Sequence, residues 1–99
     1  MIYPDDVLID IGSSFSMLSW GVMEAMVKLL TENESVECTL IDLEKSLSVP
    51  AQKFRRELSF LEGAQVIKVQ ESAFNGRMKA VLMTENGQRL FQLYIERTR

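Results

Sequence analysis

The stretch TLIDLEKSLSVPAQKFRRELSFLEG, residues 39–63, decides the fold. Thr39 is a typical N-cap residue, and leucines at helical spacing after it predict a short helix that ends near Ser48. Pro50 suits the first turn of a second helix, because its missing N–H needs no partner there. Gly63 is a natural end for that helix, which we place at about 50–62. Two helices joined by so short a turn indicate a helix-turn-helix.

The chain before this stretch predicts one long helix and a short N-terminal segment. In residues 1–15 the alternation of Val7, Ile9 and Ile11 favours a short strand or an ordered arm. From Ser16 to about residue 32, apolar side chains follow helical spacing in two stripes. A helix with two apolar stripes must be covered by more than one neighbour. That second neighbour is either another subunit or the N-terminal arm.

The chain after it predicts a hairpin and a closing helix. Two β-prone segments, 66–70 and 79–83, enclose the pair Asn75-Gly76, which is among the strongest hairpin signals. Thr84 then caps a last helix that runs through about Arg97. We therefore expect a wing at about 66–83.

This order of elements predicts an α+β fold, a winged helix-turn-helix. It consists of a three-helix core with a β-hairpin wing and a C-terminal helix. We place this domain at residues 16–99 and treat residues 1–15 as an N-terminal arm or strand.

Two segments carry a resemblance to a known family. Val49–Ile67 resembles the recognition helix and first wing strand of MarR-type regulators, and Val81–Leu90 resembles their exit from the wing into the closing helix. The resemblance covers about residues 18–97. It implies a winged helix-turn-helix that binds DNA and regulates transcription.

Composition argues against several other classes of protein. The 99 residues suffice for one small domain, and they include one cysteine, Cys38, and no histidine. Without histidine the commonest general base and metal ligand are missing. We predict no catalytic residues, no metal site and no cofactor, and therefore no enzyme. No apolar run approaches a membrane span of about 20 residues, so we expect a soluble, cytoplasmic protein.

The charges are distributed unevenly along the chain. Residues 1–44 contain one base and nine acids, whereas residues 45–99 contain ten bases and five acids. A chain with this asymmetry can present a positive face to a polyanion while the remainder repels it.

The second helix of the motif carries the candidate base-reading residues. On a helical wheel, the core side comprises Ala51, Phe54, Leu58 and Leu61. The opposite side and flanks comprise Gln52, Lys53, Arg55, Arg56 and Ser59. These residue types can contact bases in a major groove or phosphates beside it. The competing interpretation is a polar face that is merely solvated.

Basic residues also occur in the predicted wing. Asn75 lies at its tip, and Arg77 and Lys79 follow. A basic wing can enter the minor groove or hold phosphates, which adds affinity more than sequence preference. An ordinary charged hairpin is the alternative.

Our first hypothesis is a small transcriptional regulator that binds double-stranded DNA in a sequence-specific manner. It acts as a homodimer formed through its first and last helices, on a pseudo-palindromic site. The second hypothesis is a winged-helix module for protein–protein interaction within a larger complex, without DNA binding. The acidic first half and the doubly apolar first helix favour the second hypothesis.

Overall fold

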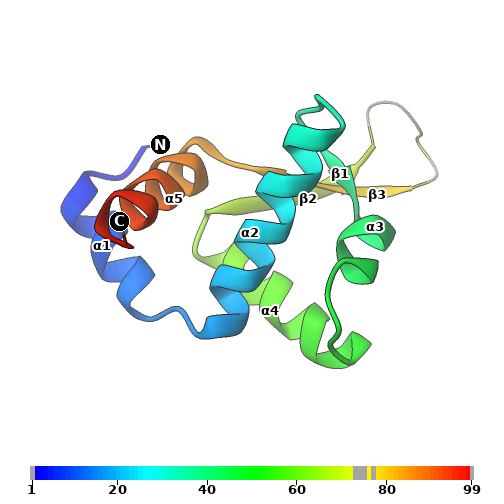
Figure 1. Ribbon diagram of the computed structural model, residues 1–99, viewed down its shortest axis with the longest axis horizontal. Coiled ribbons are helices and arrows are strands. Elements are labelled where there is room, and N and C mark those ends of the chain that lie inside the picture. Colours follow the sequence, from blue (N-terminus) through cyan, green and yellow to red (C-terminus); the bar gives the residue numbers. More distant parts are fainter. Residues whose placement is uncertain (1, 73–75, 77, 99) are drawn as a thin grey trace.

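The computed structural model describes residues 2–72, 76 and 78–98. Figure 1 shows the elements in chain order. They are α1 (Asp5–Ser13), α2 (Met17–Glu32), β1 (Cys38–Thr39), α3 (Leu40–Lys45), α4 (Ala51–Gly63), β2 (Ile67–Glu71), β3 (Lys79–Met83) and α5 (Glu85–Thr98).

The predicted α+β winged helix-turn-helix is confirmed. Helices α2, α3 and α4 form the three-helix core, and the strands form one antiparallel sheet in the order β1-β3-β2. Val69 of β2 lies opposite Val81 of β3, and Cys38 of β1 lies on the other side of Val81. The two wing strands therefore match the predicted β-prone segments. Residues 73–75 and 77, where the Asn-Gly turn was expected, are outside the described residues.

Thr39 acts as expected in the helix-turn-helix, whereas Pro50 lies one position earlier than the first-turn position predicted for it, and α3 ends at Lys45, before the expected end near Ser48. Thr39 caps α3 by accepting a hydrogen bond from the backbone N–H of Asp42, 3.1 Å away. Pro50 occupies the N-cap position of α4, immediately before the first helical residue. The helix ends at Gly63, as predicted, but the left-handed residue beyond it is Gln65 (φ 64°).

The expected N-terminal strand is wrong, because residues 5–13 form helix α1. Asp5 and Asp6 stand in its first turn, where carboxylates interact favourably with the helix dipole. Leu8 enters the core with no exposed surface, although its neighbour Val7 stays 37% exposed. Helix α1 lies along α5 (Figure 1). This tertiary contact overrides the β preference of the alternating apolar residues.

The second apolar stripe of α2 is covered in part by this chain itself. The indole of Trp20 stacks on the ring of Tyr94 from α5, with ring centroids 4.0 Å apart. Phe15, in the connection between α1 and α2, contacts the same indole at 4.8 Å. Farther along the helix, Val27 and Leu30 are half-buried and line a groove. Much of the double stripe is therefore explained within the chain.

A bidentate ion pair ties α1 to α5. Nε and Nη2 of Arg89 donate to the two carboxylate oxygens of Asp5, at 3.0 and 2.6 Å. The hydrogen bond from Arg89 holds the pKa of Asp5 below its ordinary value. The ionised carboxylate therefore favours the folded state, in which α1 is docked.

This pair predicts a pH dependence of stability. Because the pKa of Asp5 is lower in the folded state, its contribution is present above its unfolded pKa of about 4. That contribution is lost as the pH falls through the folded pKa. Asp5→Asn should therefore lower the free energy of unfolding at neutral pH, and the difference from wild type should shrink at an acidic pH below the folded pKa of Asp5. Urea denaturation at both pH values measures it, and a difference that stays constant would contradict it.

The junction between the wing and α5 is a close backbone crossing. Thr84 donates its N–H to the carbonyl of Val66 at 3.1 Å and its hydroxyl to the carbonyl of Gln65 at 2.6 Å. It also caps α5, since the N–H of Gly87 donates to Oγ1 of Thr84 at 3.1 Å. A Cβ on Gly87 would lie 2.0 Å from the carbonyl oxygen of Val66. Glycine is required here by the crossing, despite its cost in a helix.

Gly87→Ala should lower the free energy of unfolding by roughly 1–3 kcal/mol, because the backbone of Val66 must move to admit the methyl group. Gly21→Ala is the matched control: a Cβ there meets nothing within 4 Å. In the middle of α2 it should stabilise the protein by roughly 0.5–1 kcal/mol. Chemical denaturation of both variants measures the effects, and destabilisation of equal size would contradict the argument.

Candidate nucleic-acid interface

Helix α4 separates an apolar side from a cationic side. Phe54, Leu58 and Leu61 are at most 6% exposed and dock the helix in the core. The five side chains predicted to read DNA are all exposed: Gln52, Lys53, Arg55, Arg56 and Ser59. Ala51, expected on the core side, is exposed as well. The first helical residue lies beyond the edge of the core that Phe54 reaches.

Among the described residues, the three basic side chains of α4 have no hydrogen-bond or ion-pair partner, whereas its two carboxylates accept hydrogen bonds. Within residues 2–72, 76 and 78–98, Lys53, Arg55 and Arg56 form no side-chain hydrogen bond or ion pair. Glu57 is half-buried and accepts a hydrogen bond from the hydroxyl of Ser19 on α2. Oε2 of Glu62 accepts from the backbone N–H of Val69 at 3.0 Å. The exposed first half of α4 is therefore positively charged.

The beginning of α4 offers free backbone donors. Pro50 provides no side-chain cap, so the first N–H groups of the helix have no side-chain acceptor there. Such groups, together with the positive end of the helix dipole, attract phosphate oxygens. Lys45, at the end of α3, is exposed and is a further candidate for a phosphate contact.

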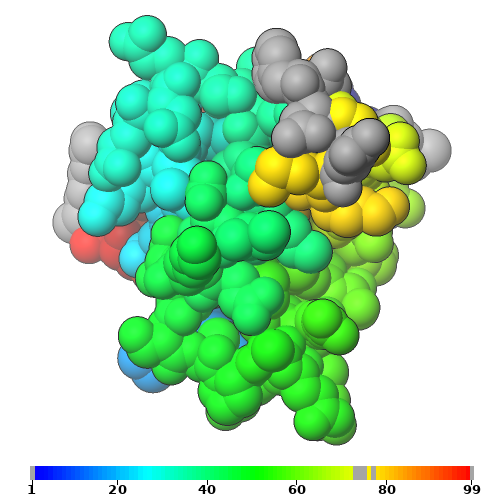
Figure 2. Space-filling view, turned by 90° about the vertical axis from the view of Figure 1, so that its right-hand side faces the viewer, coloured from blue at the N-terminus to red at the C-terminus, as the bar shows by residue number. Residues whose placement is uncertain are grey.

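The wing shares a face with the helix-turn-helix. In Figure 2, residues of about 40–60, coloured green, fill the centre and lower part of one face, and the yellow wing residues lie above them. Lys79, the first residue of β3, is exposed and lies opposite Glu71 of β2. Asn75 and Arg77, the other predicted wing contacts, lie outside the described residues. Of the three, the structure places only Lys79.

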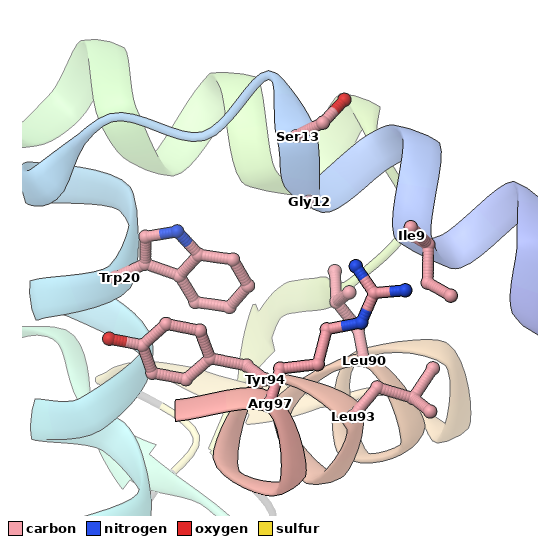
Figure 3. A pocket seen from close by; sticks show the side chains of 8 residues that line it. All are labelled: Ile9, Gly12, Ser13, Trp20, Leu90, Leu93, Tyr94 and Arg97. Atoms are coloured by element: carbon pink, nitrogen blue, oxygen red, sulfur yellow. The ribbon is translucent and has the colours of Figure 1, made fainter. Parts of the chain in front are cut away.

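A pocket at the other end of the molecule was not found by sequence reasoning. It lies where α1, α2 and α5 meet, and its volume is about 170 Å³. Trp20 and Tyr94 stack along one side, and Arg97 extends from α5 toward α1 (Figure 3). Gly12 lines the pocket with its backbone and packs closely against Leu90 and Trp20, since a Cβ there would lie 3.0 Å from Cδ1 of Leu90. The one sequence signal for it was the second apolar stripe of α2, which begins at Trp20 and predicts that this side of the helix is covered by a neighbour.

Cys38 is a buried residue of the core. It is 5% exposed in β1, and its Sγ lies 3.8 Å from the carbonyl oxygen of Val81. Burial and, to a smaller extent, the charge of Asp42 raise the pKa of the thiol to about 11. At neutral pH it therefore stays protonated and is a poor nucleophile.

The described part of the chain shows neither a metal centre nor a membrane-spanning helix. It contains no group of three or more histidine, cysteine, aspartate or glutamate side chains placed to hold a metal ion. None of its helices combines the length and the apolar character that crossing a membrane requires.

The helix-turn-helix of α3 and α4, the three-stranded sheet and the flanking α1 and α5 define a winged helix-turn-helix domain. The solved structure of BpsR from Bordetella bronchiseptica, a protein whose DNA binding is regulated by 6-hydroxynicotinic acid, has a similar fold. The TM-score is 0.65 at 19% identity, over 85% of this chain and 59% of the BpsR chain. This chain thus corresponds to less than two thirds of that protein. No model of a known protein family and no curated protein matches the sequence.

Proposed function

We propose that this protein is a MarR-like transcriptional regulator that binds double-stranded DNA in a sequence-specific manner. The observation that carries the proposal is the exposed, uncommitted cationic face of α4. Among the residues that the structure describes, the side chains of Lys53, Arg55 and Arg56 have no hydrogen-bond or ion-pair partner, while the carboxylates of Glu57 and Glu62 accept hydrogen bonds from Ser19 and Val69. If this face served only to contact water, its carboxylates would have no need of hydrogen-bond partners within the protein, and its basic side chains could pair with them.

The chemistry of α4 suits a major groove. An arginine such as Arg56 can donate two hydrogen bonds to O6 and N7 of guanine, and Gln52 can pair with N6 and N7 of adenine. Ser59 can take a base edge or a phosphate. The first half of a recognition helix makes most base contacts, and Gln52 to Arg56 occupy that half. The wing, with Lys79 at the start of β3, would contact the backbone or minor groove.

The homodimer was predicted through the first and last predicted helices, which are α2 and α5. Because Trp20 of α2 stacks on Tyr94 of α5 within the chain, we propose α1 and α5 as the surface of a dimer that presents two recognition helices to one site. Helices α1 and α5 lie together at the end of the molecule away from α3 and the wing (Figure 1). Val7 on α1 and Ile2 before it are apolar and exposed, 37% and 62%. In a symmetric dimer the two α4 helices would enter successive major grooves, about 34 Å apart. Light scattering coupled to size-exclusion chromatography tests the dimer.

Replacing Arg56 with alanine tests direct base contact. On the preferred duplex, Arg56→Ala should weaken binding by roughly 1–3 kcal/mol and relax the base preference at one position. Lys28→Ala is the charge-matched control, because Lys28 lies on α2 and pairs with Glu32 at 3.9 Å. Fluorescence anisotropy over a salt series measures both, on a selected duplex and on random duplex. Equal weakening on every sequence would make Arg56 a phosphate contact instead.

A second candidate function is favoured by apolar and acidic side chains near the motif. Ile41 on α3 is 53% exposed and Val36 before β1 is 78% exposed. Asp42 is exposed on the same short helix. These features suit a winged-helix module for protein–protein interaction. An absence of DNA binding even at low salt, with Lys53, Arg55 and Arg56 variants unchanged, would favour this function over the first.

We further propose that the pocket of α1, α2 and α5 binds a small aromatic acid that controls DNA binding. Its volume of about 170 Å³ suits a single ring, since an engineered cavity of about 150 Å³ holds benzene. Trp20 and Tyr94 contribute aromatic rings to its wall, and the guanidinium of Arg97 provides a charge for a carboxylate. The regulation of BpsR by 6-hydroxynicotinic acid supports this choice of ligand class.

Trp20 is the only tryptophan in the chain, so its fluorescence reports on the pocket directly. Benzoate and 6-hydroxynicotinate should quench it in a saturable manner, whereas benzamide, which lacks the charge, should bind at least several-fold more weakly. Arg97→Gln should remove the preference for the acid. Equal binding of benzoate and benzamide to wild type would contradict a role for Arg97.

A further inference from the structure

A short chain of hydrogen bonds joins the beginning of α2 to the middle of α4. Ser16 caps α2: its Oγ accepts from the N–H of Ser19 at 3.2 Å, and its own N–H donates to Oγ of Ser19 at 3.0 Å. The hydroxyl of Ser19 then donates to Oε1 of Glu57. One serine side chain thus completes the cap of α2 and holds the carboxylate of α4.

This contact is directional and joins α4 to α2, as the hydrogen bond from the N–H of Val69 to Glu62 joins α4 to β2. Phe54, Leu58 and Leu61 attach the helix through close apolar packing, which buries one side of α4. Ser19 is 1% exposed, so its hydrogen bond to Glu57 is shielded from competing water. The angle of a hydrogen bond restricts where both partners lie. The Ser19–Glu57 bond therefore adds a directional restraint on the rotation of α4 against α2.

The same contact keeps Glu57 from forming an ion pair with Lys53. Lys53 and Glu57 are four residues apart on α4, a spacing at which opposite charges readily pair on a helix surface. Within the described residues Lys53 forms no such ion pair, because the carboxylate turns toward Ser19. The ammonium group is thereby left available for a phosphate.

We propose that the bond from Ser19 to Glu57 is the positioning contact of the recognition helix. It sets the rotation at which Gln52 and Arg56 meet base edges, and it keeps the Glu57 carboxylate away from Lys53. The proposal rests on the proposed DNA-binding function. Glu57 is a positioning residue and touches no base itself.

Two substitutions of Glu57 separate positioning from charge. Glu57→Gln removes the negative charge and keeps an oxygen that can accept from Ser19, whereas Glu57→Ala removes both. Glu62→Gln is the matched control, since it removes one charge from the same helix at a carboxylate bound to Val69. The probes are a random-sequence duplex and the duplex enriched from a random library by the wild-type protein.

Removing the charge alone should strengthen binding to random duplex a few-fold in Glu57→Gln and Glu62→Gln, because one repulsion from phosphate is lost. Both should keep the wild-type ratio of affinities for selected and random duplex. Glu57→Ala should lower that ratio at least tenfold, although it carries the same charge as Glu57→Gln. Equal ratios for Glu57→Gln and Glu57→Ala would overturn the proposal.

Hydrogen exchange without DNA keeps the test independent of DNA binding. Amides of residues 51–63 should exchange faster in Glu57→Ala than in Glu57→Gln, measured well below the melting temperature of each variant. Ser19→Ala should reproduce the faster exchange. If the wild type binds no duplex, the DNA-binding function fails, and the exchange rates still decide whether the contact positions α4. Equal exchange in all three variants would show that it does not.

Discussion

The docking of α4 is the constraint on which the rest of the structure depends. One face of this helix must be buried to complete a core that also contains Met23, Met26 and Leu43, while the opposite face must stay free of intramolecular partners. A 13-residue amphipathic helix meets both requirements when its apolar positions recur three or four residues apart. Phe54, Leu58 and Leu61 have that spacing.

The two ends of the molecule are connected through α2. Its first turn holds Glu57 of the recognition helix through Ser19, and the next residue, Trp20, lines the pocket and stacks on Tyr94 of α5. Ser19 and Trp20 are adjacent in α2. A ligand that shifts the indole of Trp20 would therefore also move Ser19 and alter its hydrogen bond to Glu57 of α4. This adjacency gives the proposed ligand control a physical route between two sites on one rigid element.

Sequence reasoning succeeded where a few neighbouring residues define the backbone. Thr39, Pro50 and Gly63 marked the helix-turn-helix, and the apolar side of α4 was predicted at Phe54. It was wrong at residues 5–13, where the alternating apolar pattern predicts a short strand or an ordered arm and the structure has helix α1. Val7, Ile9 and Ile11 have the same pattern in either structure, and only the contact of α1 with α5 distinguishes the two.

The sequence by itself determined the order of elements from α2 to α5 and the exposed chemistry of α4, because capping, helical period and turn residues act over a few positions. Tertiary structure alone decided which glycine is indispensable, which carboxylates form hydrogen bonds within the protein and where a pocket forms. Gly87 approaches Val66, Ser19 binds Glu57 and Arg89 binds Asp5 across 21, 38 and 84 residues of chain. Such pairs leave no periodic signal, since they exist only after the core has brought distant segments together.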